Sequence, residues 1–230
     1  MKNLSNLNRF LDKCMPILTP TALVLGVLFP QVTGRFLPYV IGFFAFMTFQ
    51  GSLDSDFRQL KKVFCNLLPL IVTLGMLHIW IPCLARFLGG VFFGFNPNLV
   101  AGIVLEYIVP TGIVSFMWVN IYKGNGSLTL SIILLDTLLA PIIVPASLKV
   151  LLGTSVQMDT IGMMKDMLLM VAVPAVAGIT INQLSHGNAN KRVKPALAPF
   201  GKAALFLVVS GNSSRVAPYI RHLTPTLVRC

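Results

Sequence analysis

The sequence predicts an all-α protein whose helices cross a lipid bilayer several times, and three observations lead to this class. First, 55% of the 230 residues are hydrophobic and only 11% are charged, whereas soluble domains carry about 25% charged residues. Second, residues 14–34, 36–53, 66–85 and 167–190 contain no Asp, Glu, Lys or Arg. Each run approaches the roughly 20 residues that a helix needs to span hydrocarbon. Third, the 18 Gly and 15 Pro are typical of membrane helices, in which both are common.

Apolar runs bounded by polar or helix-breaking residues predict a polytopic helical bundle, in a single transmembrane domain over residues 1–230. The seven spans are expected at about residues 15–33, 37–53, 66–87, 98–122, 127–152, 162–184 and 199–217. Residues 88–97 are interpreted as a re-entrant or interfacial connection, and residues 185–198 as the clearest polar loop. The tail after residue 217 is too rich in charge and proline for an eighth span.

The net charge of +11 comes from basic residues that cluster between the apolar runs. This pattern is typical of loops that set the orientation of a membrane protein, and it argues against nucleic acid as a partner. With the N-terminus inside, eleven Lys and Arg residues fall on the inner side and seven on the outer side. We therefore expect a multi-pass protein of a cell membrane, the inner membrane of a bacterium, with a cytoplasmic N-terminus and the lipid bilayer as a partner.

The residue patterns of an enzyme or of a metalloprotein are not found in the sequence. The four cysteines show no paired spacing and no neighbouring histidine, so neither a zinc site nor a disulfide framework is predicted. An intramembrane enzyme is an alternative, but the sequence shows no nucleophile–base pair for it. We expect no cofactor other than Na+ or H+ as a coupling ion.

Two acidic residues, Glu106 and Asp136, lie inside otherwise apolar predicted spans. An ionised carboxylate at the bilayer centre costs at least about 2.5–3.5 kcal/mol, so it is normally turned inward, paired, protonated or used to bind a cation. The alternative is that each carboxyl group stays protonated and bonds a neighbouring helix. His78 is expected to be a satisfied hydrogen-bonding group between helices rather than a proton carrier.

The fourth predicted span is interrupted at Pro110-Thr111-Gly112. Proline removes an amide donor and glycine tolerates unusual dihedral angles, so the helix is expected to break here. In many secondary transporters the free amides of such a break face an anion and its carbonyls face a cation; a plain proline kink is the alternative. The residues expected to contact a small organic anion are Glu106, Thr111, Gly112, Ile113 and Asn120.

Side chains that carry hydroxyl and amide oxygens cluster after the break, and such oxygens suit a hard cation such as sodium. For any single Ser or Thr the alternative is a bond to its own helix backbone four residues back. We expect the cation to bind near Ser115, Thr129 and Asp136.

The same stretch carries an ordered motif: a proline–glycine break, a serine, a basic residue with a Gly-Asn turn, and a helix that contains Leu-Leu-Ala-Pro. The motif residues are Pro110, Gly112, Ser115, Lys123, Gly124, Asn125, Leu128, Thr137, Leu138, Leu139, Ala140 and Pro141. Over about 35 residues this stretch resembles the core of the bile acid:sodium symporter family. The pattern of spans before and after it agrees more loosely.

The resemblance implies a secondary transporter that moves an organic anion with a coupled cation by alternating access. It also implies ten helices in two inverted five-helix repeats, in which the broken fourth and ninth helices cross near the sodium sites. The chain would then hold the first inverted repeat and two further helices. A truncated fragment without transport activity, or a partner subunit of such a transporter, is therefore the alternative function.

Four positions depart from the family pattern, and one of them is Thr111, which stands where the family has the first Gly of its pair. Phe116 stands where the family has an Asn after the sodium-binding Ser, and Ile133 stands where it has a sodium-binding Thr. Neither side chain carries an oxygen, so the usual first sodium site is expected to be weak or absent. Asp136 replaces a Ser of the pattern, and we hypothesise that it provides a different cation or proton site.

Overall fold

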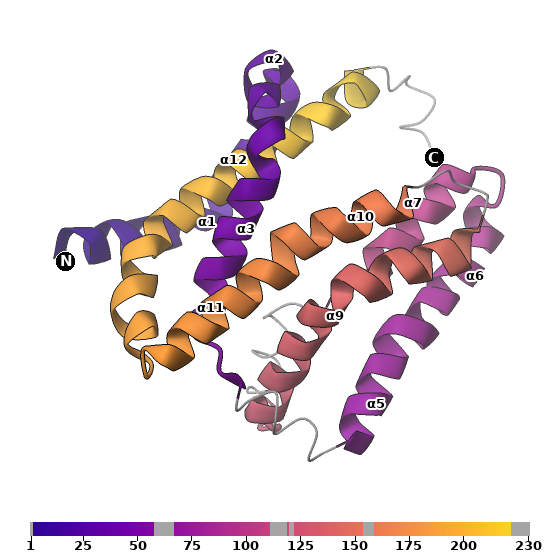
Figure 1. Ribbon diagram of the computed structural model, residues 1–230. Coiled ribbons are helices and arrows are strands. Elements are labelled where there is room, and N and C mark those ends of the chain that lie inside the picture. The colour runs from indigo at the N-terminus through magenta and orange to yellow at the C-terminus, as the bar shows by residue number, and fades with distance from the viewer. Residues whose placement is uncertain (1, 58–66, 111–118, 120–121, 154–158, 222–230) are drawn as a thin grey trace. The chain divides into compact units, whose positions relative to one another are not determined.

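The computed structural model describes residues 2–57, 67–110, 119, 122–153 and 159–221. Every regular element within these ranges is a helix, which confirms the predicted all-α class (Figure 1). The chain divides into two compact units. The first unit comprises residues 1–54 and 173–230, and the second comprises residues 55–172.

Five helical stretches among the described residues are long and apolar enough to cross a membrane. They are Pro30–Ser52, Leu67–Phe93, Leu128–Leu152, Thr160–Leu184 and Ala189–Ile220. Two shorter apolar helices, Lys13–Leu28 and Pro97–Ile108, lie where the sequence predicts the first and fourth spans. The helices therefore support a multi-pass membrane protein.

Several helices continue beyond the predicted spans into polar residues, which a hydropathy pattern does not count as membrane. The first helix begins at Lys2 rather than near residue 15. Within residues 88–97, interpreted from the sequence as a re-entrant or interfacial connection, the helix that starts at Ile81 runs to Phe93 and the next begins at Pro97. In the expected polar loop at residues 185–198, only the first four residues lie outside the following helical segments.

In the first unit, the long helix α12 (Lys194–Arg221) packs along α1 (Lys2–Leu28) and also contacts α3 (Val40–Ser52) (Figure 1). The remaining elements of this unit are α2 (Pro30–Thr33), the 3-10 helix η1 (Gly34–Tyr39), α11 (Val173–Leu184) and η4 (Ala189–Val193). The α1–α12 contact is close because Gly26 has no side chain. A Cβ at this position would lie 2.4 Å from the carbonyl oxygen of Ser210.

The second unit contains the helices that carry the candidate site. They are α5 (Leu67–Gly75), η2 (Met76–Trp80), α6 (Ile81–Phe93), α7 (Pro97–Ile108), α9 (Gly126–Leu152), α10 (Thr160–Met167) and η3 (Leu168–Ala172). One apolar core joins α7 and α9, with side chains of α10 packed against it; its buried residues are Ala101, Val104, Ile108, Ala140, Val144, Leu148 and Leu152. A smaller core, centred on Leu70 and Ile132, joins α5 and α9.

Each of the three π-helical segments among the described residues ends two residues before a proline. The segments η2, η3 and η4 precede Pro82, Pro174 and Pro195, respectively. A proline has no amide hydrogen, so the carbonyl four residues earlier loses its α-helical donor, and the wider π pattern accommodates this loss. At the end of η2 the amide of Ile81 donates to the carbonyl of Met76, five residues earlier.

Candidate functional site

The candidate site is a buried contact between His78 and Asp136. Nε2 of His78 lies 2.5 Å from Oδ1 of Asp136. Asp136 is 0% exposed and His78 is 8% exposed. His78 lies inside the candidate span Leu67–Phe93 and Asp136 inside Leu128–Leu152, so the contact joins two spans away from the ends of both.

Asp136 lies on α9 between the two apolar cores of the second unit. The residues of α9 before it, including Ile132, pack against α5, and those after it, beginning with Ala140, pack against α7. A carboxylate in such surroundings is costly unless it is paired and hydrogen-bonded. The bond from His78 therefore compensates for part of the cost of burying Asp136.

The second ring nitrogen of His78, Nδ1, is buried and has no hydrogen-bond partner among the described residues. A neutral ring that donates from Nε2 leaves Nδ1 as an unused acceptor, and a protonated ring leaves it as an unused donor. An unsatisfied buried polar atom costs about 1–3 kcal/mol, so native proteins keep few of them, and a bound water or ion, or a functional role, explains many of those that remain. His78 therefore has more hydrogen-bonding capacity than its contact with Asp136 uses.

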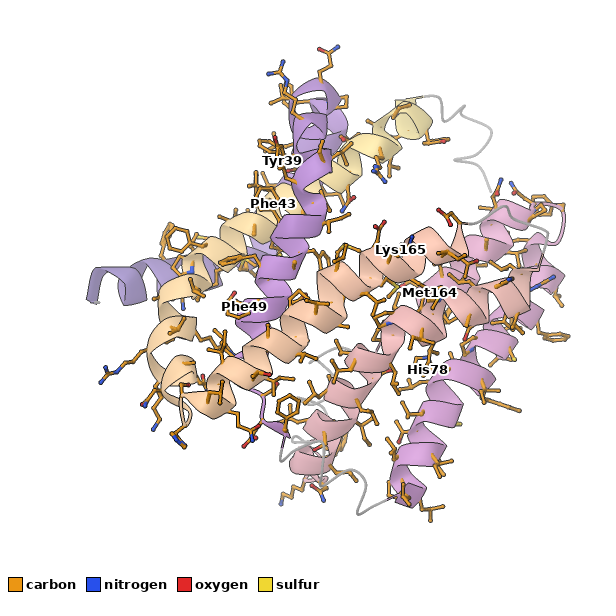
Figure 2. The ribbon with its side chains drawn as sticks, in the orientation of Figure 1. Tyr39, Phe43, Phe49, His78, Met164 and Lys165 are labelled. Carbon is orange, nitrogen blue, oxygen red and sulfur yellow. The ribbon has the colours of Figure 1, made fainter. Side chains whose placement is uncertain are left out.

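The local backbone brings His78 to this position. His78 is the middle residue of the π-helical segment η2, and Figure 2 shows it between the helix that runs from α5 to α6 and helix α9. A π segment inserts one extra residue into a helix, which turns the following residues by about 100°. Such insertions are found frequently at functional sites.

Two of the three predicted cation ligands, Thr129 and Asp136, lie on α9 within the described residues. Thr129 lies seven residues before Asp136, about two turns along the same side of α9, and its hydroxyl donates to the carbonyl of Asn125 at 3.1 Å. This is the bond to the backbone four residues back that the sequence offered as the alternative. Ser115 lies outside the described residues, so its place beside Asp136 stays a prediction.

The predicted anion site is described only at its edge. Helix α7 ends at Ile108, and Val109 is extended with φ −63° and ψ 149°, so the helix stops directly before Pro110 as predicted. Glu106 lies on the last turn of α7 and is exposed. The other predicted anion contacts lie outside the described residues: Thr111, Gly112, Ile113 and Asn120.

The sequence did not reveal which residue pairs with Asp136. His78 does form a hydrogen bond between helices, as expected, but its partner was not predicted. One signal was available: His78 is the only titratable side chain, apart from cysteine, in the run of residues 66–85 that has no charged residue. A buried acid and a lone histidine in neighbouring spans are natural partners in hydrocarbon, where unpaired polar groups are costly.

Comparison with known proteins decides the family. The model of the sodium bile acid symporter family matches residues 40–222, which is most of the chain. The chain belongs to this family. Members of the sodium bile acid symporter family are transporters, so the chain is not an enzyme. The match also confirms the resemblance drawn from the motif at residues 110–141.

Two relatives in Bacillus subtilis (strain 168) are similar to this member of the family. The uncharacterized protein YbaS is 44% identical over 209 residues, which cover 91% of this chain and 68% of YbaS. The uncharacterized sodium-dependent transporter YocS is 25% identical over 199 residues, which cover 82% of this chain and 60% of YocS. The chain therefore spans about two thirds of the length of these relatives.

Proposed function

We propose that this chain acts in a secondary transporter that moves a small organic anion across the membrane together with a cation, by alternating access. The observation that carries the proposal is the buried carboxylate of Asp136, held by His78 between two candidate spans. A carboxylate at this depth is expensive to keep for packing alone. Membership of a transporter family supports the same conclusion.

The coupling cation is proposed to bind at Asp136, near Thr129 and Ser115. The carboxylate supplies a negative charge that either Na+ or H+ can neutralise, and oxygen ligands suit Na+. The side chains of Phe116 and Ile133 lack the oxygens that the family's first sodium site uses. Asp136 is therefore proposed as the main ligand of the cation. The description of YocS as sodium-dependent is consistent with a cation of this kind.

The anion is proposed to bind at the interruption that begins at Pro110. Backbone amides left free at a broken helix carry a partial positive charge and point toward an anion, and in secondary transporters such breaks lie near the bilayer midplane. The proposed contacts are Glu106, Thr111, Gly112, Ile113 and Asn120.

The test is uptake of radiolabelled organic anions, including bile acids and keto acids, into liposomes that contain the purified chain. An inward Na+ gradient and an inward H+ gradient are imposed separately. We expect one gradient to drive uptake and Asp136→Asn to remove at least about nine tenths of it, as expected when a site loses its charged group. Asp159→Asn is the matched control, because exposed Asp159 only caps α10 through the amide of Gly162 and Asn caps equally well.

Two results would count against the proposal. Full gradient-driven uptake by Asp136→Asn would show that the carboxylate is not part of the coupling site. If the unaltered chain takes up the anion but neither the Na+ gradient nor the H+ gradient increases this uptake, coupled transport by this chain would be ruled out.

A further inference from the structure

A wide-open surface cavity of about 480 Å³ lies beside Arg86 on the second unit, and neither His78 nor Asp136 lines it. Its lining residues are Cys83, Arg86, Phe87, Gly90, Val91 and Leu151. All but Leu151 belong to α6, and Leu151 lies in the last turn of α9. The cavity therefore lies where the end of α9 meets the side of α6.

The guanidinium group of Arg86 is held in place by the end of α9. Its Nε donates to the carbonyl oxygen of Leu151 at 3.1 Å. Carbonyls in the last turn of a helix have no intrahelical donor, so this bond satisfies one of them. Gly90 leaves room for the group, because a Cβ there would lie 3.1 Å from Nη1 of Arg86.

The charge of Arg86 is not neutralised within the part of the chain that the structure describes. The described ion pairs are those of His78 with Asp136 and of Lys194 with Asp54, and neither involves Arg86. Guanidinium has five N–H donors, and the bond to Leu151 uses only the one on Nε. The donors on Nη1 and Nη2 therefore remain for an anion.

The surroundings of the guanidinium are apolar and face outward. Phe87 is 66% exposed and Val91 is 63% exposed, and both lie on a helix that is long and apolar enough to span a membrane. Apolar side chains exposed on such a helix contact acyl chains. A ligand at this cavity would meet one cationic group and a hydrocarbon-like surface together.

Arg86 lies near the end of its span, from which its side chain can extend to the headgroup region. The span Leu67–Phe93 has 27 residues. At about 1.5 Å per residue it is roughly 40 Å long, which exceeds the roughly 30 Å of hydrocarbon, so both ends reach the interface. Arg86 lies about two turns before the end at Phe93, and its long side chain can reach the headgroups from there.

We propose that this cavity binds the phosphate group of a membrane phospholipid. Arginine holds phosphate with two parallel hydrogen bonds, and an arginine already fixed through Nε loses little freedom when it does so. The acyl chains of the lipid lie over Phe87 and Val91. This site does not depend on the proposed transport function.

The test measures how lipids protect Cys83, which lines the cavity, from alkylation in a non-ionic detergent. The rate is followed by mass spectrometry of the peptide that contains Cys83, and Cys14, which does not line the cavity, is the internal control. The probes are short-chain phosphatidylglycerol, diacylglycerol with the same acyl chains, and inorganic phosphate. We expect phosphatidylglycerol alone to slow alkylation of Cys83, with no change at Cys14.

Arg86→Gln should require at least about tenfold more phosphatidylglycerol for the same protection, because it removes a charge-assisted bond. Lys149→Gln is the matched control, since Lys149 is exposed near the end of α9 but does not line the cavity. Equal protection by diacylglycerol would show that the cavity recognises only acyl chains. Equal protection by inorganic phosphate would replace the lipid with a soluble anion, and protection by none of the probes would overturn the site.

Discussion

Nε2 of His78 and Oδ1 of Asp136 lie 2.5 Å apart, although the two residues are 58 positions apart in the sequence. The contact ties η2 to α9 at a point where both are surrounded by apolar side chains. The desolvation cost of burying such a pair offsets much of the Coulomb attraction between its members. The pair is therefore weak evidence of a role in stability. Its burial between two candidate spans is consistent with the cation site proposed at Asp136.

A double-mutant cycle should show that His78 and Asp136 are energetically coupled. His78→Leu and Asp136→Leu should each lower the free energy of unfolding, the former by about 3–5 kcal/mol because it leaves a buried carboxyl group without this partner. The double variant should lose clearly less than the sum, since two apolar side chains replace the pair. Denaturant titration in detergent micelles measures the four proteins, and strictly additive losses would contradict the coupling.

The ion pair between Lys194 and Asp54 should behave very differently. The Lys194 side chain is 27% exposed and that of Asp54 is 48% exposed, so water and salt screen their attraction. Asp54→Asn should therefore change the free energy of unfolding by less than about 1 kcal/mol. The same denaturant titration at low and high salt checks this, and a loss as large as that of His78→Leu would mean that the pair is not screened.

The class and the approximate positions of the helices could be predicted from the sequence because hydropathy acts locally. Each apolar run that predicts a span carries a helix over most of its described residues, although the fourth is helical only to Ile108 before Pro110. The ends of helices were harder to predict, because α1 and α12 continue through polar residues. Polarity indicates where a chain leaves the hydrocarbon, but it does not indicate where a helix ends. Helix continuation depends on backbone hydrogen bonding, which charge and polarity do not interrupt.

The candidate site was predicted in part for a related reason. Asp136 could be selected because an acid in an apolar run is conspicuous on its own. His78 could not be paired with it, because the pairing depends on how η2 and α9 pack and on the π-helical insertion that turns the ring. Thr129 shows the opposite case. Its hydroxyl could serve as a cation ligand, but it donates a hydrogen bond to the carbonyl of Asn125 in its own helix.

The packing of α1 against α12 should depend on the absence of a side chain at Gly26. A Cβ there would lie 2.4 Å from the carbonyl oxygen of Ser210 and 2.5 Å from Cβ of Ser213, so the helices must separate. Gly26→Ala should lower the free energy of unfolding by about 1–3 kcal/mol. Gly42→Ala is the control, because nothing lies within 4 Å of a Cβ at Gly42 and alanine favours a helix.

Denaturant titration distinguishes the two glycine variants directly. A stability for Gly26→Ala equal to that of the unaltered chain would mean that α1 and α12 do not pack as closely as the structure shows. Small residues where membrane helices cross let their backbones approach, so the loss should be confined to glycines in contact.

Pro82 should control the contact between His78 and Asp136, although it is not itself one of the two contacting residues. It lacks the amide hydrogen that would bond the carbonyl of His78 in an α-helix, and η2 is π-helical directly before it. Pro82→Ala supplies that hydrogen and removes the reason for the extra residue. Return to α-helical geometry turns His78 by about 100° relative to the helix beyond it and carries the ring away from Asp136.

The measurement is the effect of Asp136→Asn on the free energy of unfolding in two backgrounds. With Pro82 in place the loss should include the bond to His78, and in Pro82→Ala it should be smaller by about 1–3 kcal/mol, because that bond is already gone. Pro174→Ala is the matched control, since Pro174 also follows a π-helical segment but η3 carries neither residue of the pair. An equal loss in the Pro82→Ala and unaltered backgrounds would show that the proline does not position His78.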